Sequence, residues 1–141
     1  EDYTVPFGKV RVYQEGTDVS LVCVGLAVHQ ALESAETLAG MGISAEVVDL
    51  RSLVPLDREG IIESVSKTGR LVVADEDYHS YGVSGEVFAS VIEHDASIFK
   101  AAPQRVCVPD VSIPFSRPLE NSILPLADRI TAAAIKTMEG K

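Results

Sequence analysis

The feature that most constrains this chain is a repeated order in which a short apolar segment is followed by a longer stretch with helical periodicity. Four such pairs occur in succession. Apolar runs without polar alternation, such as 20–24 and 71–74, are typical of strands buried on both faces of a sheet. Strands that alternate with amphipathic helices predict a mainly parallel sheet. We therefore expect an α/β fold, built as a three-layer α/β/α sandwich.

The limits of these elements follow from turn and cap residues. Asp57 is placed to cap a helix that ends before Gly69, and Gly40 stops the preceding helix. The last helix is expected from about Ser122 to Met138, with Pro125 in its first turn. The predicted strands in this alternating region are 20–24, 45–50, 71–74 and 104–108.

The beginning of the chain differs from this pattern. Residues 1–8 carry Pro6 and Gly8 and no periodicity, which predicts a lead-in segment. In 9–14, Val10 and Val12 alternate with polar residues, as in a strand with one face to solvent at the edge of a sheet. The folded domain is therefore expected over 9–141.

Composition excludes several functions. The 141 residues, 46% of them hydrophobic, suit one domain with its own core, and Cys23 and Cys107 in apolar runs indicate buried thiols. Twelve basic residues against twenty-one acidic ones give a net charge of −9, with no basic patch, which argues against nucleic acid or an anionic membrane as partner. Neither a membrane-spanning run nor a signal peptide is visible, so we expect a soluble cytoplasmic protein.

Ligands of parallel sheets collect at the carboxyl ends of the strands, which here are followed by the loops 25–28, 51–56, 75–85 and 109–119. The only acidic run, Asp75 to His79, could hold a cation or transfer protons. Consecutive side chains splay apart, however, so a solvated or interface loop is favoured. A hydrolase or transferase using His79 stays open, whereas the lack of a lysine after 104–108 disfavours a phospho-acceptor.

Two further features of this edge allow alternative functions. Gly82 and Gly85 begin a helix whose free N–H groups could bind an anion, although close packing explains the two glycines equally well. No dinucleotide or nucleoside-triphosphate motif is present. A free-standing small-molecule or anion-binding module therefore remains the alternative. His29 and His79 lie in loops where they could contact a ligand or partner, whereas His94 is expected on the surface.

Taken together, five segments resemble the C-terminal domain of transketolase-like enzymes, specifically of the β subunit of 2-oxo acid dehydrogenases. The resemblance extends nearly from end to end. It implies a five-stranded mixed sheet whose first strand is an antiparallel edge strand. The segments are YTVPFGK, AEVVDLRSLVPLD, SVSKTGRLVVADED, GVSGEV and PDVSIPFSRPLE.

The resemblance also implies that this chain is part of a larger enzyme. In the family, a pyrimidine-binding domain precedes this one, so 1–8 would lead in from a missing domain. Thiamine diphosphate, with Mg²⁺, lies between that domain and the α subunit. The diphosphate motif, a Gly-Asp-Gly with a following Asn, is absent here. We therefore expect no catalytic, cofactor-binding or metal-binding residue in this chain.

The activity implied for the parent enzyme is decarboxylation of pyruvate, a branched-chain 2-oxo acid or acetoin, with transfer of the acyl group to lipoyl. This domain would associate subunits and dock a partner. The implied partners are the α subunit, a second β subunit, which makes a homodimer of the fragment conceivable, and the peripheral-subunit-binding domain of the lipoyl acyltransferase. The −9 charge suits a basic docking partner.

The resemblance places interface candidates in two loops. One is the acidic loop and the other is the late proline-rich loop. The form DEDYHSYG differs from what pyruvate-specific members lead us to expect, so an acetoin or broad 2-oxo acid enzyme is at least as well supported. The interface candidates are Asp75, Glu76, His79, Tyr81, Pro114, Phe115 and Leu119.

Overall fold

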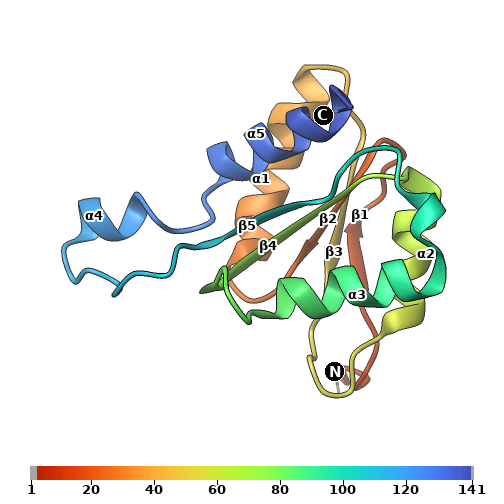
Figure 1. Cartoon of the computed structure of the whole chain (residues 1–141), viewed down its shortest axis with the longest axis horizontal. Helices are drawn as coiled ribbons and strands as arrows, with labels where there is room; N and C mark the ends of the chain where they lie inside the picture. The colour runs from red at the N-terminus through yellow and green to blue at the C-terminus, as the bar shows by residue number, and fades with distance from the viewer. Residues whose placement is uncertain (1–2, 141) are drawn as a thin grey trace.

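The apolar segments form five strands of one mixed sheet in the computed structural model, which describes residues 3–140 (Figure 1). The first two residues of the predicted lead-in and the last residue of the predicted domain lie outside the described range. The order of the strands across the sheet is β1-β3-β2-β4-β5. The strands are β1 (Arg11–Gln14), β2 (Val19–Cys23), β3 (Ala45–Asp49), β4 (Leu71–Tyr78) and β5 (Gln104–Val108).

Helices cover both faces of the sheet, which confirms the three-layer prediction. One apolar cluster joins the sheet to α1 and α5, and a second joins it to α2 and α3 (Figure 1). The helices are α1 (Ala27–Gly40), α2 (Arg58–Thr68), α3 (Val83–Asp95), α4 (Arg117–Asn121) and α5 (Ala127–Met138), with a 3₁₀ turn at Ala96–Ile98.

Strand β2 lies at the centre because every one of its residues is apolar or hydrogen-bonded inside. Its five residues are all buried, and it pairs in parallel with β3 on one side and β4 on the other. Cys23 is level with Asp49 of β3 and with Ala74 of β4, so β2 and β3 end at one edge of the sheet, beyond which β4 continues to Tyr78. The predicted common edge is therefore confirmed.

Strand β1 is the antiparallel edge strand that the sequence and the resemblance predicted. It pairs only with β3, and its residues are exposed or half-buried. Asp57 joins this edge to α2, since its Oδ2 accepts the N–H of Val10 (3.0 Å) and its Oδ1 accepts the N–H of Gly60 (3.3 Å). The predicted cap at Asp57 and the predicted stop at Gly69, with φ 73°, are both confirmed.

Two predicted limits are wrong. Strand β4 continues past Ala74 to Tyr78, so the acidic run belongs partly to the strand. The last helix, expected from about Ser122, begins only at Ala127, so buried Pro125 precedes α5 instead of lying in its first turn, and the separate short helix α4 begins within the expected loop 109–119. A helix running through Pro125 would lack one N–H donor and bring the proline ring against the preceding turn, which explains the break.

Candidate functional site

The acidic run forms an irregular end to β4. Between Ala74 and Tyr78 the strand advances four residues, while its partner β5 advances two, from Val106 to Val108. The surplus residues bulge out of the pairing, as bulges do where a strand ends at a functional edge. The side chains of the run therefore point in different directions, as predicted from their consecutive positions.

Asp75 is the buried member of this run. Its Oδ1 accepts the N–H of Asp77 (3.2 Å), whereas its buried Oδ2 has no hydrogen-bond partner among the described residues. Burial raises the pKa of Asp75 and outweighs the hydrogen bond from the N–H of Asp77, which lowers it. The expected solvated or interface loop is thus not the environment of Asp75 in this chain, although Glu76 is half-buried and Asp77 is exposed.

The turn after β4 holds His79 and Tyr81 at the surface. The N–H of His79 donates to the carbonyl of Val108 (2.7 Å), and Ser80 donates twice to the Asp110 carboxylate, at 3.1 Å from N–H and 2.6 Å from Oγ. The hydrogen bonds from Ser80 lower the pKa of Asp110. Tyr81, at φ 64°, is fully exposed. Strand β5 and this turn therefore hold each other in place.

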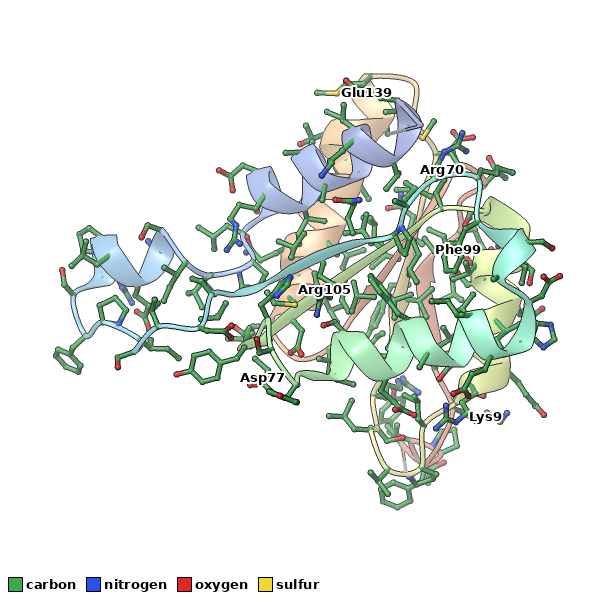
Figure 2. The ribbon with its side chains drawn as sticks, in the orientation of Figure 1. Lys9, Arg70, Asp77, Phe99, Arg105 and Glu139 are labelled. Carbon is green, nitrogen blue, oxygen red and sulfur yellow. The ribbon has the colours of Figure 1, made fainter. Side chains whose placement is uncertain are left out.

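Arg105 adds a second bond between β5 and the same turn. Its Nη1 donates to the carbonyl of His79 (2.9 Å). Figure 2 shows the Arg105 side chain beside the turn that joins β4 to α3, with Asp77 in the last part of β4.

Residues 109–126, which we call the arm, project from the body of the domain and carry α4 (Figure 1). The guanidinium of Arg129 forms hydrogen bonds next to both ends of the arm. Arg129 donates to the carbonyls of Ile123 (2.5 Å) and Leu124 (2.7 Å) and, through Nη2, to that of Cys107 (3.1 Å).

The remaining interface candidates lie on the arm. Phe115 is fully exposed, Leu119 is 58% exposed, and Pro114 is half-buried. Val111 and Ile113 are each 50% exposed, although the sequence reasoning did not select them. The spacing of 111, 113 and 115, with Pro109, Pro114 and Pro118 nearby, was the available signal for an extended apolar segment.

These residues do not assemble a catalytic set. No group of three or more His, Cys, Asp or Glu side chains among residues 3–140 could hold a metal ion. Cys23 and Cys107 are free thiols and buried as predicted, and burial raises the pKa of each thiol. His94 is exposed, also as predicted.

Close packing requires glycine at only one of the two glycine positions at the start of α3. A Cβ on Gly82 would lie 2.4 Å from the carbonyl oxygen of Tyr78, so only glycine fits. A Cβ on Gly85 would meet nothing within 4 Å, and close packing does not explain that glycine. The Oδ2 of Asp75 lies 3.7 Å from the place that this Cβ on Gly82 would take. A carboxyl therefore already stands where an anion would approach the helix.

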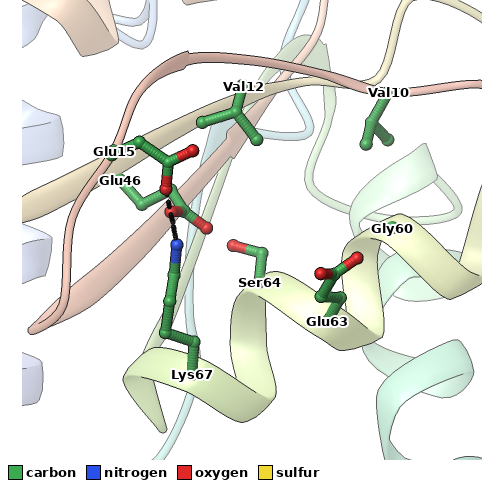
Figure 3. A pocket seen from close by; sticks show the side chains of 8 residues that line it. All are labelled: Val10, Val12, Glu15, Glu46, Gly60, Glu63, Ser64 and Lys67. Carbon is green, nitrogen blue, oxygen red and sulfur yellow. Dashed lines mark hydrogen bonds and ion pairs between the residues drawn. The ribbon is translucent and has the colours of Figure 1, made fainter.

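A second polar cluster lies elsewhere, between β1 and α2, around a cavity of about 300 Å³ (Figure 3). Lys67 of α2 pairs with Glu15 at 2.7 Å and also with Glu46 of β3, whose side chain is buried. The hydrogen bonds that Lys67 donates to the carboxylates of Glu15 and Glu46 raise the pKa of Lys67. The sequence analysis did not predict these ion pairs of Lys67, although a glutamate at position 46 inside an apolar strand was a visible signal.

The fold and its edge define an α/β/α domain with a complete core and a projecting apolar arm. The family model of the transketolase C-terminal domain matches residues 8–130. This chain belongs to the transketolase C-terminal domain family.

Curated relatives agree with this family. The chain is 47% identical over 138 residues to the acetoin:2,6-dichlorophenolindophenol oxidoreductase subunit beta of Cupriavidus necator, covering 98% of this chain and 41% of the relative. It is 40% identical to the 2-oxoisovalerate dehydrogenase subunit beta of Bacillus subtilis (94% and 41% covered). It is 39% identical to the mitochondrial pyruvate dehydrogenase E1 component subunit beta of Dictyostelium discoideum (95% and 38% covered).

A solved structure is similar over almost the whole chain. It is a split-gene transketolase described as an inactive β4 tetramer, with a TM-score of 0.84 and 34% identity over 99% of this chain and 45% of that chain. The present chain thus spans about two-fifths of the curated relatives it matches. No helix within residues 3–140 has the length and apolar character needed to span a membrane.

Proposed function

We propose that this chain is the subunit-association and docking domain at the C-terminal end of the β subunit of a thiamine-diphosphate-dependent 2-oxo acid or acetoin dehydrogenase. Residues 1–8 lead in from a pyrimidine-binding domain, and residues 9–141 form the association domain. The whole enzyme decarboxylates its substrate and passes the acyl group to lipoyl. The matched β subunits, named for acetoin, 2-oxoisovalerate and pyruvate, support this substrate class.

The observation that carries the proposal is the exposed apolar surface of the arm next to a core that is already complete. Soluble monomers rarely leave a contiguous set of large apolar side chains uncovered, and such patches mark interaction sites. Phe115 and Tyr81 are fully exposed, while the strands behind them are buried. We propose that Tyr81, Pro114, Phe115 and Leu119 contact a second β subunit.

The acidic end of β4 has a supporting part in this interface. Glu76 lies near the end of β4 and His79 lies on the exposed turn, while the carboxylate of Asp75 accepts the N–H of Asp77 within the bulge. The net charge of −9 favours basic side chains on the peripheral-subunit-binding domain of the acyltransferase, because complementary charge accelerates encounter. The α subunit is the third partner in this proposal.

Sedimentation equilibrium of the chain tests the association role. Phe115→Asp and Tyr81→Asp place a charge in the proposed interface, so each should weaken self-association at least about tenfold. Val54→Asp is the matched control, since Val54 is 93% exposed but lies in the loop between β3 and α2. Equal association constants for Phe115→Asp and Val54→Asp would contradict the proposal.

The thiamine diphosphate of the parent enzyme does not fit the residues of this chain. The carboxyl of Asp75 stands at the start of α3 and, when ionised, would repel a diphosphate at this helix N-terminus. Calorimetry with thiamine diphosphate and Mg²⁺ should therefore show no tight binding. Micromolar affinity would overturn this assignment.

The alternative, a free-standing anion-binding module, is tested separately. Phosphate or a 2-oxo acid that binds the folded chain should raise its melting temperature. We expect no shift with either compound, and a saturable shift abolished by a substitution at Gly85 would favour the alternative.

A further inference from the structure

We infer that a cavity at the carboxyl ends of β2 and β4 binds a small organic cation, namely a primary ammonium on a short aliphatic chain. The cavity has a volume of about 220 Å³. Its walls come from the start of α1, from the end of β4 and from the segment between α4 and α5. This inference goes beyond the proposed association function and does not depend on it.

The position of the cavity is the first argument. The chain runs from β2 to β3 on one side and then crosses to β4 on the other side, so β2 and β4 flank the point where the strand order reverses. The connection after β2 leads to α1 on one face, and that after β4 leads to α3 on the opposite face. Crevices at such switch points are the usual ligand sites of open α/β sheets.

The second argument is an unpaired carboxylate in the cavity wall. Glu76 is half-buried, and no donor among the described residues contacts its carboxylate. A Cβ on Gly25 would lie 3.5 Å from Oε2 of Glu76, so the carboxylate lies over the tight turn that follows β2. A partly desolvated carboxylate without a counterion is stabilised by a bound cation.

The other polar groups suit an ammonium. The Oε1 of Gln30 accepts the N–H of Ala127 (3.0 Å), which fixes the orientation of this amide in the wall. His29 lines the cavity, and its side chain makes no hydrogen bond or ion pair with another described residue, so a ring nitrogen is available to accept an N–H. Glu76 and His29 thus bring two groups that can accept an N–H to the wall of the same cavity.

The apolar part of the wall defines the rest of the ligand. Leu26, Leu124 and Leu126 line the cavity, and Pro125 between the last two is buried. These side chains can cover an aliphatic chain of a few carbons but offer it no polar partner. The net charge of −9 favours a cation and disfavours an anion of the same size.

Titration of the chain with n-butylammonium, followed by amide NMR shifts, tests this inference. Shifts should concentrate at residues 25–30 and at Glu76. Glu76→Gln keeps the shape and removes the charge, so it should weaken binding about tenfold, as should replacing the ligand by butan-1-ol or butyrate. Glu93→Gln, at an exposed position of α3, is the matched control and should change nothing.

The length of the ligand tests the apolar wall. Each methylene added from methylammonium to n-butylammonium should tighten binding up to about fourfold, the value for full burial of a CH₂ group. Phe115→Asp should leave this binding unchanged, which separates the cation site from the proposed contact of Phe115 with a second subunit. Equal affinity for butan-1-ol, or an unchanged affinity in Glu76→Gln, would overturn the inference.

Discussion

The sheet and the arm of this domain use apolar residues in opposite ways. All five residues of β2 are buried between two helical layers, whereas the arm leaves Phe115 and Leu119 in solvent. Burial of apolar side chains drives folding. Those of β2 are already covered by other parts of the same chain. Those of the arm add little to the stability of the domain alone. Their exposure is better explained by a contact outside it.

The largest expected effect comes from truncating the sheet core. Leu21→Ala removes a completely buried side chain from β2 and should lower the free energy of unfolding by about 2–5 kcal/mol. Leu119→Ala in the arm should cost under about 0.5 kcal/mol in the monomer. Urea denaturation at low protein concentration measures both. Similar losses at the two positions would remove the distinction between body and arm.

The ion pair between Lys67 of α2 and Glu46 of β3 should have the next largest effect. Lys67→Met leaves the buried Glu46 carboxylate with only the N–H of Gly16 (3.4 Å), which should cost about 1–3 kcal/mol. In the Glu46→Gln background the same substitution should cost much less, and a double-mutant cycle measures the difference. Additive effects would show that Lys67 and Glu46 are not coupled.

This ion pair should also respond to high pH. The pKa of Lys67 is raised in the folded chain, so its contribution is complete below the pKa of an unfolded lysine, about 10.4, and is lost as pH rises through the folded value. Urea midpoints of the chain and of Lys67→Met should therefore converge above about pH 10.5. A constant difference across that range would contradict the ion pair.

The Asp57 cap should have a smaller effect with the opposite pH dependence. Burial opposes ionisation of Asp57, but the N–H groups of Val10 and Gly60 and the Lys9 ammonium outweigh it, so the pKa is lowered. Asp57→Ala should cost about 1 kcal/mol. The loss should be complete above the pKa of an unfolded aspartate, about 3.9, and should disappear as pH falls through the folded value. Thermal unfolding from pH 2 to 7 measures this.

The smallest effect is expected where the body meets the exposed turn. The pKa of Asp75 is raised by burial, so the carboxyl favours folding only while it is protonated, and that contribution is lost as pH rises through the folded pKa. Asp75→Asn keeps the size and removes the charge, and it should stabilise the domain at pH 7 by up to about 1 kcal/mol. A lower melting temperature for Asp75→Asn at pH 7 would contradict this account of the orphaned oxygen.

The sequence predicted the body better than the arm for a physical reason. Continuous apolar runs and helical periodicity report burial against the same chain, so β2, β3, β5 and the first three helices were found within a few residues. The arm has no such partner in the chain. Pro118 was expected in a loop but lies in the short α4, and Pro125 was expected in the first turn of the last helix but precedes α5.

The candidate site was predicted only in part. The order of strands and helices predicted that the site lies at the carboxyl ends of the strands, in the loops that carry its exposed residues. The burial of Asp75 did not, because it depends on a bulge that pairs four residues of β4 with two of β5. The Lys67–Glu46 pair joins residues far apart in sequence, and only the folded chain brings them together.

Native-state hydrogen exchange at two protein concentrations tests the division between body and arm most directly. The amides of β2 should exchange only by global unfolding at both concentrations. The arm amides at 111–119 should exchange rapidly in dilute solution and more slowly when the chain associates. Arm amides protected equally in the dilute monomer, or β2 amides exchanging as fast as those of the arm, would contradict the account.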